Sequence, residues 1–353
     1  MRSLPPAPYD TGDPERPAYI VFTSGTGGTP RAVVHAHRAV LARRYMFEGW
    51  YGLRSDDRLM HAGAFNWTYT MGTGLVDPWT VGATALIPTP ETRPGNLPQL
   101  MAEHDVSIFA AAPGVYRKML RSAFPAMPRM RHGLSAGEKL PDVTRRRWEA
   151  ATGTQIHEAY GMSECSTFIS SCPTRPAPAG TLGFPQDGRK IRIGTSGMIE
   201  IHKTDPGLML HYLDAPDATA KKFDGQWFQT GDRGAFTPDG AITYLGRQDD
   251  MMNAGGVRVR PIEVEDALAL CAPTQDWACA EVQISRDVSI IAAFHAGPDV
   301  IEEDKITADL APLIAPYKIP RLFVPVASLP RGANNKLLRR KLRADWEARH
   351  GQA

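Results

Sequence analysis

Short apolar runs and stretches of helical periodicity alternate through the first half of the chain. The apolar runs typical of buried strands are residues 18–22, 82–87 and 106–111. Helical spacing of apolar positions is found at residues 97–104 and 115–122. Strands that alternate with helices build largely parallel sheets with helices on both faces. The pattern therefore predicts an α/β core over residues 18–179.

The segment directly after the first strand is also predicted to be helical. Its apolar residues between positions 32 and 48 follow helical spacing, and the candidate core positions are Val33, Val34, Val40, Leu41 and Phe47. A polar loop at residues 23–31 lies between strand and helix. Such a loop would stand beside a helix N-terminus, which favours bound anions.

The pattern changes after about residue 180. Shorter strands, for example 198–201 and 241–245, are separated by Gly and Asp turns, which predicts a β-rich subdomain over residues 180–247. A boundary is expected at residues 248–250. Beyond it, residues 249–353 read as a small α+β domain. Its predicted elements are a helix at 261–271, strands at 280–285 and 288–295, a helix at 303–314, a strand at 321–326 and a basic C-terminal helix.

Composition narrows the class of protein. The 353 residues carry 40 basic and 38 acidic side chains, a net charge of +2, so nothing calls for nucleic acid or a membrane surface as partner. The four cysteines form no CxxC pair, and reduced thiols are the default for such a chain. No signal peptide and no membrane-spanning run is recognised. We expect a soluble cytoplasmic protein.

The loop Thr23-Ser24-Gly25-Thr26-Gly27-Gly28-Thr29-Pro30-Arg31 carries the first candidate chemistry. Glycines let backbone N–H groups converge on an anion, and the hydroxyls and Arg31 add donors and charge. The Walker A pattern is absent. Taken alone, the run is equally well explained as an ordinary polar turn.

This loop resembles the phosphate loop of the adenylate-forming superfamily, the acyl-CoA synthetases and related AMP-dependent synthetases and ligases. Gly27 replaces a family Thr, and Arg31 replaces the usual Lys. By resemblance, the phosphates of ATP would be bound by Thr23, Ser24, Gly25, Thr26, Gly27 and Arg31.

Further motifs follow in the order found in that family. The run Tyr160-Gly161-Met162-Ser163-Glu164 resembles its Tyr-Gly-x-Thr-Glu motif. The resemblance implies that Tyr160 stacks on adenine, Ser163 contacts the α-phosphate and Glu164 helps to hold Mg²⁺. By the same resemblance, Gly137 and Glu138 line the adenine pocket, Asp232 binds the ribose hydroxyls and Arg247 contacts the nucleotide.

The C-terminal motifs imply a mobile small domain. Residues 246–250 resemble the family hinge, with Asp249 as the residue whose torsions change. Gly255, Gly256 and Arg258 match positions where CoA docks, and Lys336 falls on the catalytic lysine. Without the earlier motifs, Lys336 would be read as surface charge. Glu263 and Glu265 also match a family position, but a solvated helix face is the favoured interpretation.

A Trp at position 67, Pro78-Trp79 and Gly82-Ala83-Thr84 resemble the short- and medium-chain acyl-CoA synthetase branch. The acyl pocket would then draw on Trp67, Met71, Gly161 and Met162. Their bulk predicts a small or medium aliphatic or aromatic acid. Simple core packing is the alternative for such a Trp or Met.

These resemblances imply an ATP-dependent carboxylate–CoA ligase that forms an acyl-adenylate and then an acyl-CoA, with Mg²⁺ as cofactor and CoA as co-substrate. A carrier-protein-loading enzyme and a non-catalytic nucleotide- or acyl-adenylate-binding protein are the alternatives. Only 22 residues precede Thr23, whereas the family carries a substantial segment there. We therefore expect an N-terminally incomplete large domain at residues 1–247. A homodimer, or a partner chain that completes this domain, is the candidate assembly.

Overall fold

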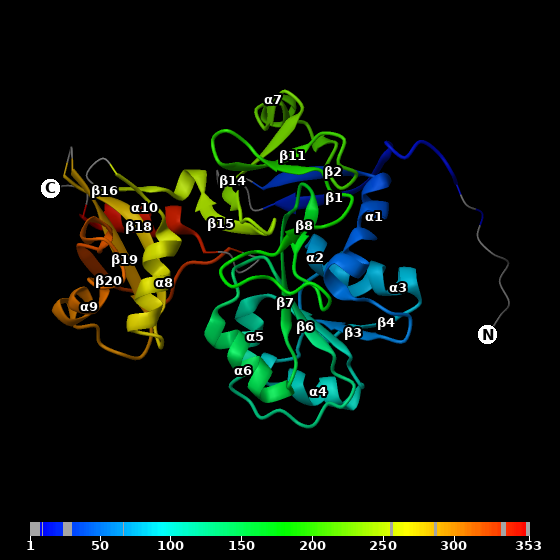
Figure 1. Cartoon of the computed structure of the whole chain (residues 1–353), viewed down its shortest axis with the longest axis horizontal. Coiled ribbons are helices and arrows are strands. Elements are labelled where there is room, and N and C mark those ends of the chain that lie inside the picture. Colours follow the sequence, from blue (N-terminus) through cyan, green and yellow to red (C-terminus); the bar gives the residue numbers. More distant parts are fainter. Residues whose placement is uncertain are drawn as a thin grey trace.

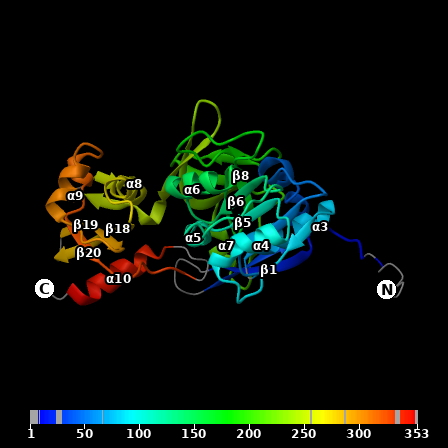
Figure 2. The same cartoon turned by 90° about the horizontal axis from the view of Figure 1, so that it is seen from below.

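The computed structural model describes residues 8, 10–23, 30–65, 67–254, 257–285, 288–332 and 337–350. Elements from residue 252 onward lie to one side of the remaining chain, and the two groups are joined through residues 248–250 (Figures 1 and 2). Within the described ranges, no helix combines the length and apolar character needed to cross a membrane.

The central sheet runs in the order β4-β3-β5-β6-β7-β8-β9. Its strands are β3 (Arg58–His61), β4 (Thr84–Leu86), β5 (Ile108–Ala111), β6 (His132–Ala136), β7 (Ile156–Met162), β8 (Ser166–Ser170) and β9 (Phe184–Pro185). Neighbouring strands from β4 to β7 are parallel, β8 pairs antiparallel with β7, and β9 pairs antiparallel with β8. The predicted α/β architecture with a largely parallel sheet is confirmed.

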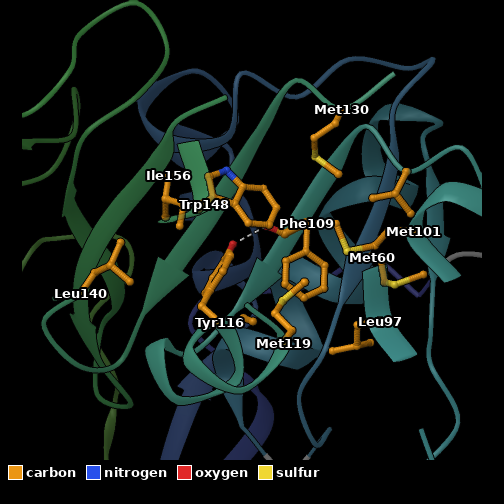
Figure 3. Close-up of a cluster of buried hydrophobic side chains, with 12 residues drawn as sticks. Met60, Leu97, Met101, Phe109, Tyr116, Met119, Met130, Leu140, Trp148 and Ile156 are labelled. Carbon is orange, nitrogen blue, oxygen red and sulfur yellow. Dashed lines mark hydrogen bonds between the residues drawn. The ribbon is translucent and has the colours of Figure 1, made fainter. Parts of the chain in front are cut away.

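Helices cover both faces of this sheet. One face carries α4 (Leu97–Glu103), α5 (Pro113–Met119) and α6 (Asp142–Thr152), and there Tyr116 of α5 and Trp148 of α6 pack against Phe109 of β5 (Figure 3). The other face carries α1 (Arg38–Ala42), η1 (Phe47–Tyr51) and α2 (Thr68–Met71) around Trp50, Tyr51 and Tyr69. The remaining short helices of this region are η2 (Gly72–Val76), α3 (Asp77–Val81) and η3 (Pro94–Asn96).

The predicted helix over residues 32–48 is wrong in its first part. Residues Arg31–Ala36 form β2, which pairs antiparallel with β1 (Pro17–Thr23) and, on its other edge, with β12 (His211–Tyr212). Val33 and Val34 are buried there, whereas Val40 and Leu41, predicted as core, are 40% and 61% exposed. β-branched side chains suit a strand buried on both faces, and a short apolar run does not distinguish this from a helix.

The β-rich region forms a second, antiparallel sheet. Its strands are β10 (Ile191–Ile193), β11 (Met198–His202), β13 (Phe223–Asp224), β14 (Trp227–Phe236) and β15 (Ile242–Arg247), with α7 (Pro216–Ala220) before β13. Ile199, Ile201 and Phe228 pack against Val33 of β2 and Phe168 of β8. This shared core fixes β14 and β15 over the carboxyl end of β7.

The C-terminal elements enclose their own apolar clusters around the sheet β18-β19-β20. They are β16 (Met252–Ala254), β17 (Val257–Val259), α8 (Pro261–Cys271), β18 (Asp276–Ser285), β19 (Val288–Ala296), α9 (Glu303–Leu310), η5 (Pro316–Lys318), β20 (Leu322–Pro325) and α10 (Arg339–His350). The ion pairs that join them to the larger group include Arg117–Asp276 at 2.8 Å and Lys139–Asp266 at 2.7 Å.

Candidate active site

Three predicted site residues converge where the two sheets of the larger group meet. Tyr160 lies on β7, Asp232 on β14 and Arg247 at the end of β15, directly opposite Asp232 in the strand register. The Tyr160 hydroxyl donates a hydrogen bond to Asp232 Oδ2 at 2.5 Å. Arg247 Nη1 lies 3.6 Å from Asp232 Oδ1. Residues far apart in the sequence thus form one polar centre.

In this centre the Tyr160 phenol stays neutral and the Arg247 guanidinium stays charged. Burial, reinforced by the Asp232 carboxylate, raises the pKa of the Tyr160 phenol well above its usual value. Burial opposes the charge on Arg247, but Asp232 and Asp249 outweigh it and raise the pKa of Arg247. The arrangement therefore offers a neutral aromatic ring, a carboxylate and a guanidinium to a ligand.

The predicted hinge residue is held from both sides. Asp249, in η4 (Gln248–Asp250), accepts hydrogen bonds from Arg247 Nε at 2.8 Å and from Arg340 Nη2 of α10 at 2.7 Å. Although partial burial opposes ionisation, the Arg247 hydrogen bond and charge lower the pKa of Asp249. Charge-assisted hydrogen bonds thus hold the connection between the two groups of elements on both sides.

Glu164 lies in a separate contact beside the loop region. Its side chain is 9% exposed, and its Oε1 accepts a hydrogen bond from the Tyr212 hydroxyl at 2.6 Å. The Arg31 guanidinium lies 5.3 Å from the Tyr212 ring centroid. Burial and the Glu164 charge raise the pKa of Tyr212. No motif pointed to Tyr212, which belongs to β12 and meets Glu164 only through strand pairing.

Ser163 is positioned through its backbone. Its carbonyl accepts a hydrogen bond of 2.7 Å from Nε2 of His35 on β2. Burial lowers the pKa of His35 to about 4, so the ring is neutral at physiological pH. His35 was also missed by the sequence analysis, because its position on β2 was assigned to a helix.

Trp67 and Gly137, predicted for different pockets, are in contact. Gly137 follows β6 with φ +97°, and a Cβ on it would lie 2.5 Å from Cη2 of Trp67. Trp67 also packs edge-to-face on Tyr69 at 5.2 Å between ring centroids. A side chain larger than Gly at position 137 would displace the indole. The Trp67 ring therefore packs directly against the backbone of the loop that follows β6.

The other predicted acyl-pocket residues are spread over a wider area. The backbone N–H of Met71 donates to the Trp67 carbonyl at 2.9 Å. A Cβ on Gly161 would lie 2.1 Å from the Ser166 carbonyl oxygen, which explains Gly where β7 and β8 come close. Met162 packs on the cluster of Cys165 and Phe168 rather than on that of Trp50.

Glu263 and Glu265 of α8, which were predicted to lie on a solvated helix face, both form ion pairs. Glu265 accepts hydrogen bonds from Arg339 Nη2 at 2.6 Å and from the Cys279 amide at 2.8 Å, and Glu263 pairs with Lys318. A solvated position is therefore wrong for Glu265, whose side chain is 14% exposed, whereas the paired side chain of Glu263 is 28% exposed. Glu138 forms an ion pair of 3.0 Å with Arg331, which also joins the two groups of elements.

Several predicted site residues lie outside the described residues, namely Ser24, Gly25, Thr26, Gly27, Gly255, Gly256 and Lys336. Thr23 and Arg31 face each other across the β1–β2 pair, so the loop connects two strands and no helix begins at its end. Arg258 is exposed on β17, opposite Asn253. In the part of the chain that is described, no group of three His, Cys, Asp or Glu side chains suited to a metal gathers.

The Tyr160–Asp232–Arg247 centre lies by the carboxyl end of β7 in a largely parallel sheet, the edge at which open α/β sheets bind their ligands. The sequence profile of the AMP-binding enzyme family matches residues 3–210, more than half of the chain. The chain belongs to the AMP-binding enzyme family.

Known proteins similar to this chain include CoA ligases. Benzoate–CoA ligase of Thauera aromatica is 31% identical over 351 residues, which cover 94% of this chain and 66% of that protein. Human mitochondrial acyl-coenzyme A synthetase ACSM2A is 28% identical, covering 96% of this chain and 63% of that protein. The crystal structure of anthranilate CoA ligase AuaEII with anthranoyl-AMP superposes with a TM-score of 0.83 at 28% identity, covering 94% of this chain and 68% of that chain. The chain thus spans less than two thirds of the length of the first two relatives.

Proposed function

We propose that the protein is an ATP-dependent carboxylate–CoA ligase that forms an acyl-adenylate and then an acyl-CoA. The observation that carries the proposal is the joined Tyr160, Asp232 and Arg247 centre on an AMP-binding fold. Its relatives include benzoate–CoA ligase and acyl-coenzyme A synthetases. An acid–thiol ligase needs such a centre to hold the nucleotide through both half-reactions.

The nucleoside is assigned to the convergent centre. Asp232, a buried carboxylate, is suited to accept hydrogen bonds from both ribose hydroxyls. Tyr160 offers its ring to adenine while its hydroxyl stays on Asp232. Gly137 and Glu138 form the adjoining edge after β6, and Arg247 contributes charge to the nucleotide.

The phosphates are assigned to the loop and to Ser163. Thr23, Ser24, Gly25, Thr26, Gly27 and Arg31 would provide donors to the polyphosphate. Glu164 fits a role beside Mg²⁺, because its Oε2 makes no hydrogen bond to a described residue and Mg²⁺ is often held by one carboxylate together with substrate phosphates. When bound, the ion neutralises phosphate charge.

In the first half-reaction, the substrate carboxylate attacks the α-phosphorus and pyrophosphate leaves. Lys336 would stabilise the charge on the phosphoryl oxygens. In the second, the CoA thiolate attacks the acyl carbon and AMP leaves. We propose that residues 249–353 rotate about Asp249 between the two steps, which brings Gly255, Gly256 and Arg258 to the CoA entrance.

The acid is proposed to be aromatic or a small to medium aliphatic acid. The contact between Trp67 and Gly137 gives the pocket an aromatic wall next to the nucleotide, and Met71, Gly161 and Met162 would complete its lining. Relatives named for benzoate and anthranilate support an aromatic acid. We also propose a cytoplasmic location and, as partners, a second copy of the chain or a chain completing the large domain.

The decisive experiment is ATP–pyrophosphate exchange with benzoate, anthranilate and short- and medium-chain fatty acids, followed by CoA-dependent release of AMP. Exchange with at least one acid, together with CoA consumption, is expected. Exchange without CoA consumption would favour a carrier-protein-loading enzyme. AMP binding with no exchange for any acid would favour a non-catalytic binding protein.

A further inference from the structure

A lysine outside every recognised motif stands next to the convergent centre. Lys222 follows α7, and its backbone is fixed by two hydrogen bonds: its N–H donates to the Thr219 carbonyl at 3.0 Å, and its carbonyl accepts from the Gln229 amide at 2.7 Å. The half-buried side chain places its ammonium 5.8 Å from the centroid of the ring of Phe228, a residue of β14.

The Lys222 ammonium and the Arg247 guanidinium flank the same small space. A Cβ built on Gly231 would lie 4.0 Å from Lys222 Nζ and 3.3 Å from Arg247 Nη2. Gly231 has φ +88°, which a residue with a side chain rarely adopts, so no side chain at this position separates the two cations. Two cations therefore lie close together around Gly231, the residue directly before Asp232.

The Lys222 ammonium has no ion pair with any residue that the structure describes. Of the charged groups around it, Glu164 and Asp232 attract it, whereas Arg247 and Arg31 repel it. Burial is the largest influence and lowers the pKa of Lys222. A partly buried cation that makes no direct ion pair is costly, and a bound anion would offset part of that cost.

The neighbours of Lys222 indicate which anion would bind to its ammonium group. Asp232, the proposed ribose ligand, directly follows Gly231, and Arg31, at the end of the predicted phosphate loop, is among the charged groups that act on the Lys222 ammonium. The phosphate between ribose and polyphosphate is the one that remains in AMP. We propose that Lys222 binds this nucleotide phosphate, as an additional phosphate-binding residue, an inference that rests on the proposed function of the site.

This role differs from that of Lys336. Lys222 belongs to the same group of elements as Asp232 and stays with the nucleotide, whereas Lys336 belongs to the segment proposed to rotate. Lys222 therefore contributes to the binding of ATP and AMP alike. The contribution of Lys222 to the binding free energy depends on the phosphate of the ligand and not on its nucleoside.

The test compares AMP with adenosine by calorimetry on the full chain. Lys222→Gln should weaken AMP binding about 10- to 100-fold, the range expected for a hydrogen bond to a charged group, and leave adenosine binding unchanged. Lys222→Arg, which keeps the charge, should recover most of the AMP affinity. Lys221→Gln is the matched control, because this neighbouring lysine is exposed.

Equal weakening of AMP and adenosine by Lys222→Gln would overturn the inference, since it would indicate a structural effect. The inference would also be overturned if Lys222→Gln bound AMP as tightly as the control variant Lys221→Gln does. If the wild-type protein binds neither AMP nor ATP, the proposed function itself fails, and the inference fails with it.

Discussion

At the residue scale, a fully buried ion pair holds β8 against the β-rich region. Arg189 and Asp205 have side-chain exposures of 0% and 0%. Arg189 also donates to the carbonyls of Thr167 at 2.9 Å and Cys165 at 3.0 Å, and Asp205 accepts from the Lys190 amide at 2.8 Å. Every charge here is satisfied, so removing one partner leaves the other buried and uncompensated.

We expect Arg189→Met to lower the free energy of unfolding by about 3–5 kcal/mol, measured by urea denaturation. The control is Lys341→Met in the exposed Lys341–Asp345 pair of α10, for which about 0.5 kcal/mol or less is expected. Similar small losses for both variants would show that the buried pair is dispensable.

At the element scale, α6 is attached to the sheet through one large side chain. Trp148 is 0% exposed and packs edge-to-face on Tyr116 at 5.2 Å and stacked on Phe109 at 6.1 Å between ring centroids (Figure 3). The remaining residues of α6 are mostly polar and exposed. Because tertiary packing supplies most helix stability in proteins, α6 depends on this contact.

Trp148→Ala should therefore destabilise the protein by about 3–5 kcal/mol, with loss of protection from hydrogen exchange in α6. The same change at Trp79, which is 63% exposed on α3, should cost far less in the same denaturation assay. Equal losses at the two positions would contradict the anchoring role of Trp148.

At the same scale, strand β2 of the β1–β2 hairpin was predicted as part of a helix. Val33 and Val34 satisfy a helical pattern as well as a strand pattern. What decides is the partner: β2 is paired on both edges, by β1 and by β12 from a distant part of the chain. The predicted phosphate loop therefore connects two strands, and its proposed affinity for anions would rest on its own N–H and hydroxyl groups and on Arg31.

At the scale of the whole molecule, buried neutral histidines make stability sensitive to acid. Burial lowers the pKa of His35 and His132 to about 4 and that of His61 and His157 to about 3, from 6.5. Between pH 6.5 and about 4, the unfolded chain binds protons that the folded protein does not. Stability is therefore expected to fall as the pH is lowered through this window.

The slope should reach about 1.4 kcal/mol per pH unit for each such group. His157→Leu removes one group and should make the fall shallower, while the pH dependence above 7 stays that of the wild type. Urea midpoints measured across this range check the expectation. An unchanged slope in the variant would exclude His157 as a contributor.

The proposed rotation of residues 249–353 is also a property of the whole molecule. Lys336→Ala should cripple adenylate formation but largely spare thioester formation from supplied acyl-adenylate. A bulky substitution at Gly256 should do the reverse. Single-turnover measurements of each half-reaction test this, and equal loss in both for Lys336→Ala would argue against its assignment.

The sequence alone determined the class of fold and the order of the motifs. Alternating apolar runs predicted the parallel sheet, and α8 begins and ends at the predicted residues, Pro261 and Cys271. These features are local, since periodicity and turn residues act over a few positions. Tyr160, Asp232 and Arg247 were found for a different reason, namely that each lies within a recognisable family motif.

Only the tertiary structure decided which distant groups meet. Tyr212 reaches Glu164 because β12 pairs with β2, and Lys222 reaches Gly231 because β13 folds back on β14. Neither residue has a local signal, since its surroundings are created by strand pairing between segments far apart in the chain. Burial and pairing of this kind set the charge environment of the site, and they are absent from any one stretch of sequence.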